Sequence, residues 1–391
     1  MVRKILRWIG YGLLALLLLI LLFVAFNWTL VSNMVKVGGA KITDVGSFQP
    51  AETVNGCPGT GFRSNPAALS AETFTAMRAY SDKHGGVGLI VLQNGQIAGE
   101  AYRRGANAKT RASSQSLHKT VVAMVIGAAV RDGVIASLDA PVGDTLNEWR
   151  GDSRGKLTFR QLLSMSSGLH NPSMSKMELP AMNMMLGDVS DAALSLQIER
   201  NPGTFNYSNA NFQIAGMALS RALKKAGRGD YAAYLADTLW CPLGNSNASL
   251  WLEHPGGEAR YFAYLDASVR DWARVGELIR LKGEWNGKQV LPTAWIDEMI
   301  KASPANPNYG LGIWRGSPWT KARRYSKEVS MTATHSQAYL ADDVVFLDGF
   351  GGQRVYVVPS TGLVIARSGE TSMTWDDAVL VNLALRGIAA K

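Results

Sequence analysis

Residues 113–130, SSQSLHKTVVAMVIGAAV, contain the feature on which the expected fold and site both depend. A run of small and apolar side chains begins after Thr120 and predicts a buried helix. Ser116 and Lys119 stand three residues apart at the head of this run, and positions i and i+3 share one face of a helix. The sequence therefore predicts that a hydroxyl and an amine meet where an apolar helix enters the core.

Such a pair can act as a nucleophile and its base. A serine hydroxyl attacks only when a base takes its proton, and burial lowers the pKa of a lysine amine so that it can be neutral. The Ser-x-x-Lys spacing recurs at residues 153–156 and 173–176, but no long apolar helix follows there. The structural alternative is that Ser116 caps the helix and Lys119 is solvated.

Two other segments carry groups that suit the same chemistry. Tyr207-Ser208-Asn209 is the only Tyr-x-Asn in the chain; the phenol can move a proton, and the amide can donate to a carbonyl and accept from an amine. The segment 348–358, DGFGGQRVYVV, is a Gly-rich entry into a strand, where a main-chain N–H could form an oxyanion hole with that of Ser116. The alternatives are a turn with a hydrogen-bonded tyrosine and a β-bulge.

The rest of the chain places strands near both ends and helices in the middle. Residues 67–85 have helical spacing, and the segment 86–105 predicts a hairpin around Asn94-Gly95. Segments in 170–300 are mostly helical, and residues 353–369 predict a second hairpin before a closing helix. This order predicts a split α/β domain whose sheet joins distant segments around a mainly helical insertion.

The first thirty residues predict a membrane helix. Arg3, Lys4 and Arg7 precede a stretch from Trp8 to Leu30 that has no charge and is long enough to cross a bilayer. The positive-inside rule leaves the basic residues in the cytoplasm and exports the rest, which places the folded part in the periplasm. The alternative is a cleaved signal peptide, but the small residues at 38–40 come well after the apolar run. We expect an uncleaved anchor in the inner membrane.

The composition favours a globular protein without a nucleic-acid or metal site. The net charge of +9 comes with no long Lys/Arg block, so nucleic acid is not an expected partner. The five histidines and two cysteines form no ligand-spaced cluster, and we expect no metal and no other cofactor. Cys57 and Cys241 could pair in an exported domain, but their number does not require it. The oligomeric state is left open.

Together and in this order, the motifs resemble the serine β-lactamase-like, penicillin-recognising hydrolases. The similarity is greatest to the branch of class C β-lactamases, esterases and 6-aminohexanoate-dimer hydrolases, and it covers roughly residues 75–388. The matching phrases are SLHK (116–119), LTFRQLLSMSSGL (157–169), NPGTFNYSNANFQIAG (201–216), CPLG (241–244), NYGLGIW (308–314) and GFGGQRVYVVPSTGLVIAR (349–367).

The resemblance implies the α/β (α+β) fold of the β-lactamases and transpeptidases, an antiparallel-rich sheet flanked by helices with an inserted mainly helical domain and the site between them. The expected divisions are an anchor at 1–30, a linker and lead-in at 31–66, and a hydrolase domain at 67–391, with an α/β part at 67–135 and 300–391 and a mainly helical part at 136–299.

The resemblance also implies the roles of the site residues. Ser116 would be the acylated nucleophile, and Lys119 its general base. Tyr207 would protonate the leaving group and later activate water. Asn209 would hold the substrate carbonyl and orient the lysine. The backbone N–H groups of Ser116 and Phe350 would form the oxyanion hole.

One departure concerns the third motif, where many relatives carry Lys-Thr-Gly or a histidine. This chain has Leu347-Asp348-Gly349, so the cation that would hold a substrate carboxylate is missing. We place Gly349 with Phe350 at the substrate, and we interpret Asp348 as a turn residue, with a substrate-facing role as the alternative. Arg354 is a possible substitute cation. Short esters and neutral amides are therefore the expected substrates, and β-lactams are not.

The sequence thus predicts a membrane-anchored periplasmic serine hydrolase acting on a small ester or amide. Two alternatives stay open. One is a non-catalytic envelope binding protein with the β-lactamase fold, and the other is a true β-lactamase or D-amino-acid peptidase.

Overall fold

Six antiparallel strands form the central sheet of the computed structural model, which describes residues 1–326 and 332–389. Their order is β3-β2-β14-β13-β12-β9. The strands are β2 (Gly86–Gln93), β3 (Gln96–Tyr102), β9 (Trp314–Arg315), β12 (Val345–Gly349), β13 (Gln353–Val358) and β14 (Leu363–Gly369). Because β2 pairs with β14, the prediction of a sheet that joins distant segments is confirmed.

Two predicted hairpins supply four of these strands. Asn94 and Gly95 between β2 and β3 have φ angles of 48° and 74°, the left-handed pair that a tight hairpin turn requires. Gly362 before β14 has φ of 70° and closes the turn after β13. Local turn chemistry was therefore enough to locate both hairpins.

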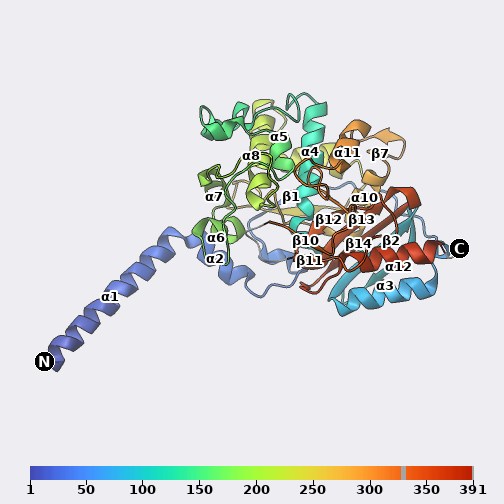
Figure 1. Cartoon of the computed structure of the whole chain (residues 1–391). Coiled ribbons are helices and arrows are strands. Elements are labelled where there is room, and N and C mark those ends of the chain that lie inside the picture. Colours follow the sequence, from blue (N-terminus) through green and yellow to red (C-terminus); the bar gives the residue numbers. More distant parts are fainter. Residues whose placement is uncertain (327–331, 390–391) are drawn as a thin grey trace.

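Helices cover both faces of this sheet. On one face, α10 (Val269–Arg280) lies against β13 and β14. The close approach depends on Gly276, because a Cβ there would lie 2.8 Å from Val355 Cγ1. The helices α3 (Ala71–Lys83) and α12 (Asp377–Ala389) lie side by side along the other face (Figure 1). The sheet is thus a buried middle layer.

The inserted region is built around one buried helix. All residues of α4 (His118–Arg131) from His118 to Ala129 are buried, and α8 (Asn209–Lys225) packs beside it. The other helices are α5 (Phe159–Leu163), α6 (Leu179–Leu186), α7 (Val189–Ser195), α9 (Tyr231–Leu235) and α11 (Thr293–Ile300). The α10 helix comes from the stretch expected to belong to the helical part, yet it covers the sheet.

Residues 31–66, expected to be a linker, contribute to the folded body. The strand β1 (Ala51–Val54) pairs with β5 in a second sheet of order β1-β5-β6-β4. The other strands of this second sheet are β4 (Arg111–Ala112), β5 (Ala248–Trp251) and β6 (Leu265–Ser268). Two further sheets have two strands each: β7 (Glu284–Trp285) with β8 (Lys288–Gln289), and β10 (Ala322–Arg324) with β11 (Thr332–Thr334). Cys57 forms a disulfide with Cys241, a pairing that the cysteine count left open.

The N-terminus forms two helices. In the described part of the chain, α1 (Val2–Phe26) is the one helix long and apolar enough to cross a bilayer, and its apolar window is wholly exposed. It projects away from the body (Figure 1). The following α2 (Trp28–Val37) packs on α6, where Asn33 Nδ2 donates a hydrogen bond of 2.7 Å to the carbonyl of Leu186. The first part of the expected linker is therefore a docked helix.

Candidate active site

Ser116 lies on a tight turn that leads into α4. The turn is a 3₁₀ segment (Gln115–Leu117), and the helix begins at His118. Gln115 has φ of 48°, a left-handed conformation that costs free energy for a residue with a side chain and that often marks a functional site. Ser116 itself is half-buried and faces a pocket. The hydroxyl is thus presented by a constrained backbone instead of a flexible loop.

The Lys119 amine is buried and points back at Ser116. Only 1% of the Lys119 side chain is exposed, and Nζ lies 2.7 Å from Ser116 Oγ. The amine also donates to Asn209 Oδ1 and to the carbonyl of Phe262, each at 2.9 Å. A neutral amine has two N–H donors and one lone pair. Because these two partners can only accept, the lone pair of neutral Lys119 is left for the Ser116 proton.

Burial also sets the charge of this amine. It lowers the pKa of Lys119 to about 7, and the negative charge of Asp348 opposes this only in part. Near neutral pH a large fraction of Lys119 is therefore unprotonated. The geometry and the proton affinity together suit a general base.

Tyr207 and Asn209 reach the same place from the start of α8. Ser208 caps this helix by accepting from the N–H of Ala210, which fixes the residues on either side of it. Lys119 Nζ lies 5.0 Å from the centroid of the Tyr207 ring. Burial and the charge of Asp348 raise the pKa of Tyr207, and its hydrogen bond with Ser116 opposes that rise. The phenol is thus held neutral and next to Ser116.

The end of β12 closes the site from the other side. Gly349 lies against the turn that carries Ser116, because a Cβ at Gly349 would be 2.6 Å from the carbonyl oxygen of Ser114. Phe350, the next residue, lines the pocket and is 43% exposed. The lack of a side chain at Gly349 therefore brings the Phe350 backbone close to Ser116, as an oxyanion hole requires.

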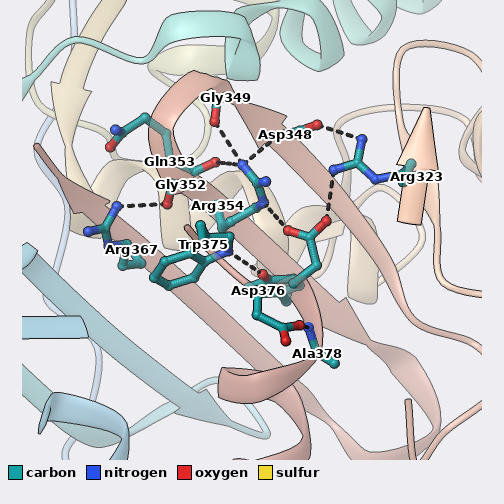
Figure 2. Close-up of polar contacts among 12 residues, drawn as sticks. Arg323, Asp348, Gly349, Gly352, Gln353, Arg354, Arg367, Trp375, Asp376 and Ala378 are labelled. Atoms are coloured by element: carbon teal, nitrogen blue, oxygen red, sulfur yellow. Dashed lines mark hydrogen bonds and ion pairs between the residues drawn. The ribbon is translucent and has the colours of Figure 1, made fainter. Parts of the chain in front are cut away.

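The interpretation of Asp348 as a turn residue is wrong. Asp348 lies within β12 and is 5% exposed. Arg323 Nη1 donates to Asp348 Oδ2 at 2.7 Å, and Arg354 Nη1 lies 2.5 Å from Asp348 Oδ1 (Figure 2). Both arginines also pair with Asp377 at 2.8 Å. These two arginines and two aspartates form a closed ring of four ion pairs. Sequence spacing could not reveal this ring, because its members come from β10, β12, β13 and α12.

The ion-pair ring also shows whether Arg354 can replace the cation that is missing from the third motif. Arg354 donates to the Gly349 carbonyl at 2.7 Å as well as to its carboxylates, so it is committed to the backbone beneath the site (Figure 2). Burial tends to lower the pKa of Arg354, but Asp348 and Asp377 raise it overall. The two carboxylates are balanced by two guanidinium groups. Neither Arg354 nor Asp348 is therefore a free charge at the substrate.

The candidate site residues surround a pocket of about 440 Å³. Ser116, Tyr207, Asn209 and Phe350 all line it, and so do methionines from α6 and the preceding loop. Its size falls within the roughly 300–1,000 Å³ that is usual for small-molecule sites. The predicted site residues are thus gathered around one cavity.

The competing positions do not form equivalent sites. Lys156 and Lys176 of the other two Ser-x-x-Lys sequences are exposed, whereas Lys119 is buried. Ser153 and Ser173 hydrogen-bond instead to Asp152 and Ser175. Within residues 1–326 and 332–389, no group of three or more His, Cys, Asp and Glu side chains is placed to hold a metal ion.

Several contributors were missed by sequence analysis. The Phe262 carbonyl that holds Lys119 is a backbone group and leaves no sequence signal. His118 fixes this loop, because its Nδ1 lies 3.0 Å from the Ala263 carbonyl. Trp314, within a phrase quoted for the resemblance, stacks on Tyr207 with ring centroids 5.6 Å apart. The segment 308–314 was noted for its family resemblance, but the sequence did not show that its tryptophan contacts Tyr207.

Comparison with known proteins agrees with this architecture. Residues 72–373 match the family model described as Beta-lactamase. Among curated proteins, protein flp of Staphylococcus aureus is 23% identical over 177 residues. That match covers 42% of this chain and 34% of flp, so the chain spans about a third of the length of the curated relative it matches.

Solved structures share the fold. A Bacillus anthracis protein provisionally named as a 6-aminohexanoate-dimer hydrolase has a TM-score of 0.69 at 19% identity, covering 89% of this chain and 92% of that one. A Bacteroides dorei DSM 17855 protein provisionally named as a beta-lactamase has a TM-score of 0.65 at 21% identity, with 82% and 99% covered. A family VIII carboxylesterase has a TM-score of 0.59 at 16% identity, with 86% and 99% covered. The predicted fold class is confirmed.

We predict that Lys119→Arg lowers kcat/KM on a neutral ester by at least ~10²-fold, the low end for loss of a general base. Arginine keeps the charge but does not deprotonate in proteins. In the wild type, kcat/KM should rise as the pH increases through about 7. The reason is that only the neutral Lys119 amine can accept a proton, and its pKa is lowered to about 7. The measurement is a pH profile of kcat/KM for both proteins.

The matched control is Lys156→Arg, the same change at an exposed lysine with the same spacing to a serine. It should behave as the wild type. Near-native turnover by Lys119→Arg would show that another group accepts the serine proton.

Proposed function

The chain belongs to the beta-lactamase family, and we propose that it is a serine hydrolase that cleaves an ester or amide through an acyl-enzyme on Ser116. One observation carries the proposal. Lys119 Nζ lies 2.7 Å from Ser116 Oγ and also donates to two groups that can only accept, Asn209 Oδ1 and the Phe262 carbonyl. When the amine is neutral, its lone pair is therefore left for the proton of Ser116. A solvated or capping role would not require such a buried amine.

Acylation follows from this geometry. Lys119 takes the proton from Ser116 Oγ as the oxygen bonds to the substrate carbonyl carbon. The carbonyl oxygen becomes an oxyanion beside the N–H groups of Ser116 and Phe350. The bond to the alcohol or amine then breaks, and Tyr207 passes a proton to the leaving group while the Lys119 ammonium restores the phenol. The acyl group stays on Ser116.

Deacylation uses the same groups in the opposite direction. Water gives one proton to the Tyr207 and Lys119 pair and bonds to the acyl carbon. The bond from that carbon to Ser116 Oγ breaks, and the serine regains its proton. The products are a carboxylic acid and the free enzyme. Asn209 keeps Lys119 oriented through both stages, since it accepts from the amine at 2.9 Å.

The pocket favours neutral substrates over carboxylate-bearing ones. Among the described residues that line it, Asp348 is the only one with a formal charge, and two arginines balance that charge. A β-lactam or peptide terminus would find no unpaired cation among them. This supports an esterase or amidase over the alternative of a true β-lactamase or peptidase. The buried Lys119 amine next to Ser116 and Tyr207 supports turnover over a binding protein.

We place the enzyme in the inner membrane with its catalytic part in the periplasm. No residue in the apolar window of α1 is buried, which suits a lipid environment. Cleavage near Ala40 would remove α2, whose Leu30 and Asn33 are buried against the body, so the docking of α2 supports an anchor that is retained. The disulfide between Cys57 and Cys241 is typical of an oxidising compartment.

Labelling with a fluorophosphonate tests the proposed nucleophile. We predict a single modified serine, Ser116, because it alone among the three Ser-x-x-Lys serines has a buried lysine within hydrogen-bond distance. Peptide mass spectrometry locates the adduct, and Ser116→Ala should abolish it. Ser153→Ala is the matched control and should label fully. Labelling at another serine, or none on the folded protein, refutes the proposal.

A comparison of two chromogenic substrates tests the substrate class. We predict hydrolysis of p-nitrophenyl butyrate and weak or absent hydrolysis of a chromogenic cephalosporin. A charge-assisted hydrogen bond to the cephalosporin carboxylate would be worth about 1.5–3 kcal/mol, or roughly ten- to a hundred-fold in rate, and the pocket lacks its donor. The measurement is kcat/KM for both on one preparation. A faster cephalosporin would favour the β-lactamase alternative.

Extraction of native membranes tests the anchor. We predict that the full-length protein stays with the membrane through high-salt and carbonate washes, because a hydrophobic helix is held by the hydrophobic effect, which salt does not screen. The solubilised protein should retain the residues of α1 by N-terminal sequencing. Release by salt alone, or a mature N-terminus at Lys41, would indicate a cleaved signal peptide.

A further inference from the structure

Three methionines, Met174, Met184 and Met185, line the pocket beside Ser116, and we call them the methionine wall. Met184 and Met185 lie on α6, and Met174 lies in the loop before that helix. Phe262 and Phe350 line the cavity as well. Methionine side chains are flexible and polarisable and adapt to apolar partners of different shape. The wall therefore offers a surface that an alkyl chain can fill.

The scarcity of charged side chains around the pocket also favours an apolar ligand. Of the described lining residues only Asp348 is ionisable at neutral pH, and it is 5% exposed and paired with Arg323 and Arg354. A charged substrate group placed against the methionines would lose water without gaining a partner. An apolar group gains free energy there, because burial of hydrocarbon is favourable in proportion to its area.

The methionine wall is also the part of the enzyme attached to the N-terminal helices. Asn33 of α2 donates to Leu186, the last residue of α6, and Leu30 is buried at only 2% exposure. Asn33 follows Phe26, the end of α1, by seven residues, which span about 10 Å in helical conformation. If α1 crosses the bilayer, α6 lies close to its surface (Figure 1).

Exposed apolar side chains lie on these same elements. Met34 and Val35 of α2 are 53% and 78% exposed, and Leu179 at the start of α6 is 40% exposed. Met174 at the pocket is 54% exposed. Large apolar side chains at the exit of a membrane helix suit the interface between headgroups and acyl chains. These apolar side chains therefore occur both on the helix that follows the anchor and on the elements that line the pocket.

We propose that the methionine-walled pocket binds the acyl chain of a bilayer-resident ester or amide, which the enzyme takes directly from the membrane surface. The proposal rests on the proposed acyl-enzyme mechanism and names its substrate class. The acyl carbon bonds to Ser116 as its bond to the alcohol or amine breaks, and water then releases a long-chain carboxylic acid. The chain lies along Met174, Met184 and Met185 throughout.

A chain-length series tests the acyl site, with full-length protein in nonionic detergent. We expect kcat/KM to rise more than about tenfold from p-nitrophenyl butyrate to octanoate, because each buried methylene is worth up to about fourfold. Met174→Gln should reduce this ratio several-fold. Met373→Gln is the matched control, since Met373 is 62% exposed and lies outside the pocket. A flat or falling series in the wild type would overturn the proposal.

Vesicles test the route of entry. The protein is reconstituted in phosphatidylcholine vesicles, and 4-methylumbelliferyl oleate is placed either in the same vesicles or in a separate population. We expect at least about tenfold faster hydrolysis when the enzyme and the ester share a bilayer. Equal rates would mean that the substrate arrives through water and would overturn uptake from the membrane.

These results are distinguishable from failure of the underlying mechanism. If Ser116 is not labelled by fluorophosphonate and p-nitrophenyl acetate is not hydrolysed, the proposed function itself is wrong. If both succeed and the chain-length series is flat, only the acyl-chain proposal fails.

Discussion

The site depends on the burial of one amine. Lys119 lies at the start of a helix whose first three turns are wholly buried, and two acceptors hold its N–H groups. Burial lowers its pKa to about 7, so it can be neutral and still be hydrogen-bonded. The acceptors come from α8 and from the loop before β6, which means that the helical part must pack correctly before the base exists. The lowered pKa of Lys119 therefore depends on correct packing of the helical part.

The sheet contributes by bringing β12 against the turn that carries Ser116. Gly349 allows contact with the backbone of Ser114, and Arg354 holds the Gly349 carbonyl from below. Arg354 is in turn fixed by Asp348 and Asp377. Four buried charges are costly to remove from water, and they stabilise only when every partner is in place. The ring therefore ties the strand end, and with it the backbone of Phe350, to one position.

Much of this organisation follows from local pattern. The Asn94-Gly95 and Gly362 turns and the long apolar helix after Ser116 are encoded in short segments, and the predictions from them agree with the structure. The resemblance to a known family then related Ser116, Lys119, Tyr207 and Asn209 to one another before any contact was known. Asp348 was misjudged, because its partner Arg323 lies 25 residues away in the chain and its partner Arg354 faces it across the β12–β13 pair.

The sequence by itself determined the class of fold, the membrane-length helix and the set of candidate site residues, because each is encoded in a short pattern of apolar spacing, turn residues or motif. Tertiary structure alone decided which serine has a buried base, that Cys57 pairs with Cys241, that α2 docks on α6, and that the third-motif aspartate is neutralised. The reason is physical. The pKa of a group and the net charge of a pocket depend on what surrounds them in space, and those neighbours are distant in the chain.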